Sequence, residues 1–352
     1  MKQPVGELSP RKPKWLRIRL RTTPEFQEVR RSMRELSLNT VCEEARCPNI
    51  FECWSERTAT FMILGDICTR RCGFCAVTSG RPNPGVDADE PRHLAEAVAK
   101  LGIGHAVITS VDRDDLPDGG ASHFAAVIRA LRERVPECAV EILTPDFKGV
   151  DDPLTPILAA RPDIFSHNVE TVPRLYRTAR PGSSYRASLA LLAEAVRRGA
   201  PRVKTGVMVG LGESREELAA TLRDIRDTGT AVLTIGQYLQ PTTEHLPVAR
   251  YVPPAEFDEI RSEGLALGFD HVEAGPLVRS SYHARDHYGP GGPPVAQTPD
   301  GVAGGSRLAA EAELGQAAET VPFSVIPAQA GIQSGDRIER RPGPRPSPVR
   351  QT

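Results

Sequence analysis

The stretch TATFMILGDICTRRCGFCAVTSG, residues 58–80, decides the fold. It joins an apolar run at 58–64 to a loop in which Cys68, Cys72 and Cys75 are spaced C-x3-C-x2-C. A short apolar run that ends at a glycine is typical of a buried strand. In proteins built from βα units, functional side chains gather on the loops that follow the carboxyl ends of the strands. The stretch therefore predicts the first strand of a parallel sheet and the first loop of a functional site.

Outward from this stretch, short β-branched runs alternate with longer amphipathic ones as far as about residue 288. This alternation is typical of βα units around a parallel sheet. It predicts strands at 58–64, 105–109, 139–143, 163–166, 202–209 and 231–236, with helices near 90–101, 120–134, 151–160, 184–198, 214–227 and 254–268. Six such units make an α/β fold, a partial (β/α)6 TIM-like barrel that stops short of the full eight units.

The two flanks of the predicted barrel, which spans residues 58–288, differ from it in composition. Residues 1–57 do not fit the alternation and hold three cysteines of their own, so we expect an N-terminal, cluster-binding extension packed against the barrel. Residues 289–352 hold ten glycines and ten prolines with one aromatic residue, Phe323. That composition is typical of disordered chain, and we expect a disordered C-terminal tail without function.

The overall composition excludes several classes of protein. The chain has 352 residues, of which 39% are hydrophobic and 25% charged, as in globular proteins. With 44 basic and 45 acidic residues the formal charge is −1, so no global excess of charge favours binding to nucleic acid or to an anionic membrane. No apolar run approaches the ~20 residues of a membrane span, and no secretory leader is recognisable. We expect a cytoplasmic protein.

Polar side chains follow each predicted strand, where the strands of a barrel share one rim. They are Cys68, Cys72 and Cys75 after the first strand, Ser110 and Asp112 after the second, Asp146 after the third, Asn168 and Glu170 after the fourth, Glu213 and Ser214 after the fifth, and Gln237 after the sixth. The sequence therefore predicts one polar site at one mouth of the barrel. None of the eight histidines pairs at the spacing of a helical metal site, and we assign them no role.

Six of the seven cysteines fall within residues 42–75. An odd number of cysteines in a reducing compartment argues against disulfides and favours metal ligation. Three thiolates on one loop can hold three irons of a 4Fe-4S cluster and leave the fourth iron open to a small molecule. A structural zinc site is the main alternative, but it needs four closed ligands and usually takes paired, closely spaced cysteines.

The loop C-x3-C-x-F-C, with Phe74 before its last cysteine, resembles that of the radical S-adenosylmethionine (SAM) superfamily. A second group, Cys42-x4-Cys47-x5-Cys53, precedes it, and the two groups together resemble the lipoyl synthase family. The resemblance runs from Trp15 to about Tyr288. It is carried by KPKWLRIRL, VCEEARCPNIFECW, TSVDRDDLPDGGASHF, HNVETVPRLYRTARPG, MVGLGE, LTIGQYLQPT and VRSSYHA as well as the cysteine loop.

This resemblance implies a sulfurtransferase that inserts two sulfur atoms at C6 and C8 of an octanoyl chain attached to a lysine of a carrier domain. It implies SAM and two 4Fe-4S clusters, of which the second is consumed as the sulfur source. The first cluster would be held by Cys68, Cys72 and Cys75, and the second by Cys42, Cys47, Cys53 and Ser281 of the RSSY sequence. Ser281 and Arg279 would take part in the reaction.

The resemblance and the rim positions also suggest contacts for SAM. Phe74, Ser110 and Asp112 are expected near the cluster and the methionine end of SAM. Asn168 and Glu170 follow the fourth strand, where ribose hydroxyls need hydrogen-bonding partners. A solvated acidic loop for Asp112 and a helix cap for Asn168 are the plainer alternatives.

The implied partners are octanoylated lipoyl carrier domains, namely E2 subunits of 2-oxoacid dehydrogenases and the H protein of glycine cleavage. A low-potential electron donor and an iron–sulfur cluster carrier are implied as well, and neither nucleic acid nor a membrane is expected. Two alternatives stay open from the residues. One is another radical SAM enzyme that inserts sulfur into an RNA base or a free small molecule, and the other is a zinc-binding interaction module.

Overall fold

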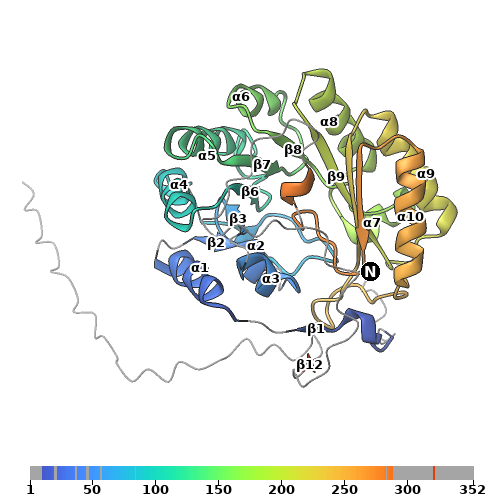
Figure 1. The fold of residues 1–352 in the computed structure, drawn as a ribbon. Coiled ribbons are helices and arrows are strands. Elements are labelled where there is room, and N and C mark those ends of the chain that lie inside the picture. Colours follow the sequence, from blue (N-terminus) through green and yellow to red (C-terminus); the bar gives the residue numbers. More distant parts are fainter. Residues whose placement is uncertain are drawn as a thin grey trace, which may run out of the picture.

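The computed structural model describes residues 10–19, 22–35, 38–44, 47–55, 58–83, 85–282, 284–287 and 320–321. Its centre is one eight-stranded sheet in the order β11-β10-β9-β8-β7-β6-β3-β2, parallel throughout except at β2. The parallel strands are β3 (Thr60–Ile63), β6 (His105–Ser110), β7 (Ala139–Leu143), β8 (Ile164–Ser166), β9 (Val203–Val209), β10 (Val232–Gln237) and β11 (His271–Gly275). The sheet curls into an incomplete ring (Figure 1).

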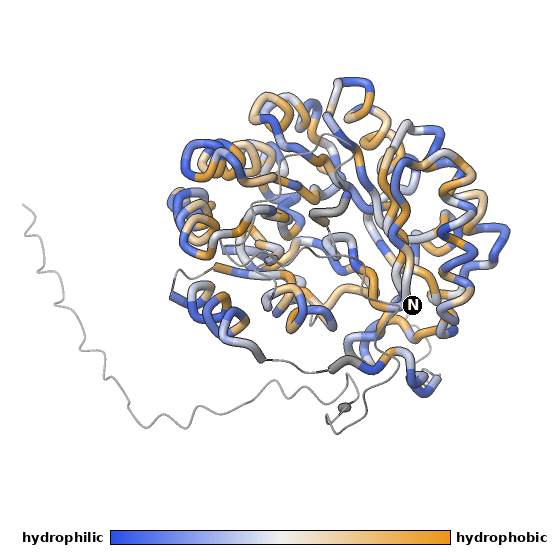
Figure 2. Tube along the Cα trace, in the orientation of Figure 1, coloured by the Kyte–Doolittle hydropathy of each residue, from blue (hydrophilic) through white to orange (hydrophobic). Residues whose placement is uncertain are grey.

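Helices cover the outer face of this ring, one after each strand from β3 to β10. They are α4 (Glu90–Leu101), α5 (Ala121–Arg134), α6 (Leu154–Ala159), α8 (Tyr185–Arg197), α9 (Arg215–Asp227) and α10 (Pro254–Ala266). Their apolar stripes turn towards the strands and their polar faces turn outwards (Figure 2). The prediction of six βα units in a partial barrel is confirmed, and the expected element boundaries lie within a few residues of those observed.

Strand β11, which follows the sixth unit, was not predicted from the sequence. Its residues alternate between Val272 and Ala274, which are buried, and His271, Glu273 and Gly275, which are less so. Two polar side chains and a glycine on one face hide the apolar period that marked the other strands. A seventh parallel strand therefore completes the sheet beside β10.

The N-terminal extension packs on the open side of the ring. Its elements are η1 (Lys14–Leu16), β1 (Ile18–Arg19), α1 (Pro24–Glu35), β2 (Asn39–Thr40), α2 (Val41–Glu44) and α3 (Ile50–Ser55). Strand β2 joins the sheet antiparallel to β3, and Phe26 of α1 stacks on Phe51 of α3 with ring centroids 5.2 Å apart. These residues share one hydrophobic core with the barrel. The expected boundary between 1–57 and 58–288 stays a prediction.

The C-terminal part of the described chain returns to the barrel. After β11 the chain crosses the mouth at 276–282 and forms the short turn η3 (Ala284–His287) against β6 (Figure 1). Most of the predicted tail, 289–352, lies outside the described residues. Its described part is β12 (Thr320–Val321), which pairs antiparallel with β1, a contact that the composition did not suggest. Among the described residues, no helix combines the length and the apolar character that a membrane span requires.

Candidate cluster and cofactor site

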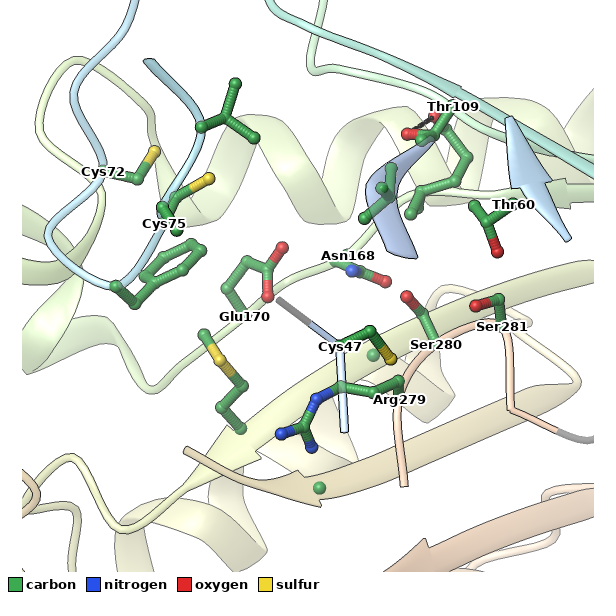
Figure 3. A pocket seen from close by; sticks show the side chains of 18 of the residues that line it. Cys47, Thr60, Cys72, Cys75, Thr109, Asn168, Glu170, Arg279, Ser280 and Ser281 are labelled. Atoms are coloured by element: carbon green, nitrogen blue, oxygen red, sulfur yellow. Dashed lines mark hydrogen bonds between the residues drawn. The ribbon is translucent and has the colours of Figure 1, made fainter. Parts of the chain in front are cut away.

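A cavity of about 340 Å³ opens at the carboxyl ends of the strands. Its lining includes Cys42, Cys47, Cys68, Cys72, Phe74, Cys75, Ser110, Asp112, Asn168, Glu170, Arg279 and Ser281, so every predicted site residue except Cys53 lines it. Of the other polar residues predicted at this mouth, Gln237 also lines the cavity, whereas Asp146, Glu213 and Ser214 do not. Figure 3 shows side chains around this space and labels ten of them.

The loop with Cys68, Cys72 and Cys75 is closed at its base by a small two-stranded sheet. Strand β4 (Ile67–Cys68) pairs in parallel with β5 (Thr78–Ser79), and the backbone N–H of Gly80 donates to the carbonyl of Cys68. This closure holds the loop at the cavity wall. The sulfur atoms of Cys72 and Cys75 lie near each other on the same side of the cavity as Glu170 (Figure 3).

Arg70, inside the same loop, anchors it to the loops after β6 and β7. Its guanidinium pairs with both carboxylate oxygens of Asp114 at 2.7 and 2.8 Å and with Asp146 at 2.6 Å, and Asp112 lies at 3.4 Å. The side chain of Arg70 is 4% exposed. Next to it, the backbone N–H and hydroxyl of Thr69 both donate to the carbonyl of Asp112. Buried, multiply hydrogen-bonded ion pairs of this kind fix geometry.

His245 is a further anchor of the loop that the sequence did not reveal. Its Nε2 donates to the carbonyl of Cys75 at 2.9 Å, and the backbone N–H of Leu246 donates to the carbonyl of Gly73 at 2.9 Å. The segment after β10 thus lies across the cysteine loop. The only signal in the sequence was the position of His245 after a predicted strand end, because 170 residues separate it from Cys75.

The thiols on this loop are unstable as thiolates without a compensating cation. Burial raises the pKa of Cys72 to about 12 and the pKa of Cys75 to about 11, and it also raises the pKa of Cys68. Metal ligation requires the thiolate, and a bound cation removes the penalty of burying that charge. Three soft donors on one loop, with no fourth cysteine in the loop, fit three irons of a 4Fe-4S cluster with one iron open.

Three buried polar atoms in the cavity wall have no hydrogen-bonding partner among the described residues. They are the hydroxyl oxygen of Ser110, the side-chain carbonyl of Asn168 and one carboxylate oxygen of Asp112. An unpaired buried polar atom costs about 1–3 kcal/mol, so such atoms in a cavity wall are suited to a polar ligand. The carboxylate of Asp112 lies between Arg70 at 3.4 Å and the sulfur of Cys68 at 3.6 Å, where burial raises its pKa.

Glu170 has an unusual backbone. Its φ of 71° is in the left-handed region, which costs a non-glycine residue about 1–3 kcal/mol. The strain is held by two hydrogen bonds to β9, from the Glu170 N–H to the carbonyl of Gly206 and from the N–H of Met208 to the carbonyl of Glu170. Burial raises the pKa of Glu170, and the buried guanidinium of Arg180 opposes that shift. Strain of this kind is typical of functional sites.

The second cysteine group contributes to the cavity from the N-terminal extension and meets the C-terminal segment there. Cys47 and Arg279 lie side by side, with Ser280 and Ser281 close by (Figure 3). Burial raises the pKa of Cys42 to about 12, and its neighbour Cys47 adds to that shift. The amide of Asn49 donates to the carbonyl of Leu277 at 2.8 Å, which ties the two segments together.

Cys53 lies outside the cavity lining, half-buried on α3. The Cys53 thiol is close enough to Tyr282 to contribute to the raised pKa of that phenol. The hydroxyl of Tyr282 donates to Glu52, the neighbour of Cys53, at 3.3 Å. The chain after Ser281 therefore runs next to Cys53. Cys42, Cys47 and Ser281 line the cavity, and Cys53 lies beside the residue that follows Ser281. Three thiols and a serine hydroxyl are a donor set that fits a second cluster.

Comparisons with known proteins show the family of the chain. The model of the radical SAM superfamily matches residues 62–225, and that of the N-terminal domain of lipoyl synthase matches residues 1–47. The lipoyl synthases of Rubrobacter xylanophilus and Methylococcus capsulatus are each 59% identical over 277 residues. These cover 78% of this chain and 86% and 85% of theirs. That of Chloroflexus aurantiacus is 54% identical over 80% of this chain and 92% of its own.

Each of these relatives matches more than three quarters of the chain at 54–59% identity. The chain belongs to the lipoyl synthase family of radical SAM enzymes.

Proposed function

We propose the following division of work within this enzyme, a radical SAM sulfurtransferase that uses SAM and 4Fe-4S clusters and acts on lipoyl carrier proteins. Cys68, Cys72 and Cys75 hold the cluster with the open iron. Phe74, Ser110, Asp112, Asn168 and Glu170 bind SAM beside it. Cys42, Cys47, Cys53 and Ser281 hold the second cluster, whose sulfur atoms go to C6 and C8 of the octanoyl chain.

One observation carries this proposal: a single cavity is lined by the cysteine loop on one side and by Cys42, Cys47 and Ser281 on the other. A substrate carbon between the two groups would be within reach of both. The wall between them is largely apolar and includes Met62, Val111, Leu143, Val207, Leu239 and Val278. Such a wall suits an eight-carbon alkyl chain, because it binds methylene groups and excludes water.

The chemistry at C6 and C8 requires a reagent that no side chain supplies. When bound and reduced, SAM supplies a carbon radical able to abstract hydrogen from an unactivated C–H bond. The protein binds and orients the reactants. Ser110 and Asn168 offer their unpaired oxygen atoms to SAM, and Arg70 and His245 keep the cysteine loop in place. Arg279 lies beside Cys47, where its positive charge favours the thiolate.

The partners follow from the reaction. The substrate is an octanoyl-lysine on a lipoyl carrier domain, with E2 subunits of 2-oxoacid dehydrogenases and the glycine cleavage H protein as the expected carriers. A low-potential donor delivers electrons for SAM cleavage, and an iron–sulfur cluster carrier rebuilds the consumed cluster. Unpaired, metal-binding thiols are suited to a reducing compartment, and we place the reaction in the cytoplasm.

Two triple variants test the division of work. Replacement of Cys68, Cys72 and Cys75 by alanine should abolish formation of 5′-deoxyadenosine from SAM. Replacement of Cys42, Cys47 and Cys53 by alanine should leave SAM cleavage measurable but stop sulfur transfer to an octanoylated carrier peptide. Cys138, buried beside β7 and outside the cavity, offers the matched control: Cys138→Ala should keep both activities.

The assay is anaerobic and contains reductant, SAM and the octanoylated peptide, with deoxyadenosine and the thiolated peptide measured by mass. Lipoyl product from the Cys42, Cys47 and Cys53 variant would show that the sulfur comes from elsewhere. Deoxyadenosine from the Cys68, Cys72 and Cys75 variant would show that the open-site cluster is misplaced.

A further inference from the structure

Strand β11 and turn η3 bring two histidines and a glutamate together outside the cavity described above. His271 and Glu273 are two residues apart on β11, so their side chains leave the same face of the strand. His287 of η3 faces them, with its ring centroid 4.8 Å from that of His271. One ligand atom from each of the three residues lies within 4.8 Å of the other two.

This cluster is inside the barrel, near the end opposite the cysteine loop. His271 pairs with Val232 at the start of β10, which does not line the cavity, and Glu273 pairs with Thr234, the first residue of that strand that does. Turn η3, drawn in orange within the ring of strands in Figure 1, packs against β6, and His287 is fully buried. The cluster thus lies at the floor of the barrel, below the cavity.

The donor set has the chemistry of a transition-metal site. Two imidazoles and one carboxylate, with a further position for water, are typical of zinc and related divalent ions. The Nε2 of His271 lies 3.6 Å from a carboxylate oxygen of Glu273 and is a buried atom without a hydrogen-bonding partner in the protein. Ligand atoms on one zinc ion are about 3.3 Å apart at bond lengths of 2.0–2.1 Å, so rotations of these side chains are enough to close the site.

A buried lysine, Lys204, is close enough to Glu273 for their charges to interact. The ammonium group of Lys204 forms its ion pair with Glu141, at 2.7 Å, and the side chains of Lys204 and Glu141 are fully buried. The side chains of His271 and Glu273 are 29% and 23% exposed. A metal ion can therefore reach the side chains of His271 and Glu273 from solvent.

We propose that His271, Glu273 and His287 form a third metal site, which binds one divalent transition-metal ion such as zinc. The ion joins η3 to β11 and fastens the C-terminal segment at His287, six residues after Ser281. The proposal stands on the geometry of β11 and η3 and does not depend on which residues hold the two clusters.

Zinc binding to the enzyme with both clusters loaded tests the proposal. The anaerobic enzyme is incubated with zinc chloride, desalted and assayed for zinc, and a parallel sample receives magnesium chloride. We expect about one retained zinc per chain and no retained magnesium, because the donors are imidazoles. X-ray absorption at the zinc edge should show only nitrogen and oxygen ligands, at about 2.0–2.1 Å, whereas zinc on cysteine would show sulfur at about 2.3 Å.

Variants connect the zinc to the three residues. Loss of an outer-shell partner costs a metal site about 10–100-fold in affinity, so loss of a ligand in His271→Asn or Glu273→Gln should cost at least about 100-fold. Glu273→Gln keeps the shape of the side chain and guards against misfolding. His93→Ala, a change on the outer helix α4, should retain zinc as the parent enzyme does. No retained zinc, sulfur ligands at the zinc edge, or unchanged zinc in both variants would each overturn the proposal.

Discussion

The Nε2 atom of His245 and the carbonyl oxygen of Cys75 are 2.9 Å apart and form a hydrogen bond between the segment after β10 and the cysteine loop. Because a carbonyl can only accept, Nε2 carries the proton. Nδ1 then accepts from the hydroxyl of Thr242 at 2.8 Å. The amide of Gln240 donates to the carbonyl of His245, which fixes the backbone of this anchor.

The first prediction is that loss of this anchor slows SAM cleavage without changing how efficiently the radical is used. His245→Phe keeps a ring and removes a hydrogen bond of about 1 kcal/mol, which corresponds to about a fivefold lower rate of 5′-deoxyadenosine formation. The ratio of thiolated product to deoxyadenosine should not change, because His245 anchors the loop that holds Cys75 and not the second cysteine group. His93→Phe is the control. A normal cleavage rate with a lower product ratio would contradict this role.

The contact between His245 and Cys75 could not be predicted from the sequence, whereas most of the fold could. The cysteine loop, the six βα units and the residues of the mouth follow local rules of spacing and period, and they could be predicted. The pairing of His245 with Cys75 depends on how two distant loops meet, which no local pattern encodes. Strand β11 was missed for a related reason, because His271 and Glu273 point into the barrel and break the apolar period.

The burial of two charged side chains was also not predictable from the sequence. A lysine such as Lys204 or an arginine such as Arg180 is usually solvated, yet both are buried here. Lys204 is paired with Glu141, and Arg180 donates to the carbonyl of Asn168 at 3.0 Å. Such burial can be deduced only when the partner is known, since a lone buried charge is prohibitively costly.

The second prediction concerns the buried pair of Lys204 and Glu141. Lys204→Met should destabilise the fold by about 3–5 kcal/mol, because it leaves the buried Glu141 carboxylate with only His105, 3.6 Å away, in place of the ammonium group. For a chain of this size that loss corresponds to a melting temperature lower by roughly 6–15 °C. The double variant Lys204→Met with Glu141→Leu should recover most of the loss, because no charge is then buried. Equal melting temperatures for the single and double variants would show that the pair is not coupled.

The third prediction concerns acid stability and His167. This side chain is fully buried, its Nδ1 donates to the carbonyl of Thr144, and its Nε2 accepts from the hydroxyl of Ser188, each at 2.9 Å. Burial, with the nearby charge of Arg180, lowers its pKa to about 3. The unfolded chain, with a pKa of about 6.5, binds the proton more readily, so stability is complete above pH 6.5 and falls as the pH drops towards 3.

Between pH 7.5 and pH 6.0 this linkage removes about 0.8 kcal/mol, or roughly 2–3 °C in melting temperature. His167→Asn can keep the donor to Thr144 but does not titrate, so its melting temperature should fall less over the same interval. Acid loss of iron–sulfur clusters affects both proteins alike and cancels in the comparison. The same slope in both proteins would exclude His167 as the titrating group.

The last prediction concerns Ser281, which lines the cavity together with Ser280 and the thiols of Cys42 and Cys47. An alkoxide is a weaker partner for iron than a thiolate, so a serine ligand suits a cluster that must come apart. Ser281→Cys should therefore keep both clusters and normal deoxyadenosine formation but slow sulfur insertion by at least about tenfold, since one stronger bond of about 1.4 kcal/mol is enough for that factor. Ser280→Ala should have a mild effect, because the hydroxyl of Ser280 is not assigned to the cluster. Iron content, deoxyadenosine and thiolated peptide are measured for both variants. A fully active Ser281→Cys enzyme would exclude lability of this ligand as the reason for a serine here, and a severe defect in Ser280→Ala alone would move the ligand to Ser280.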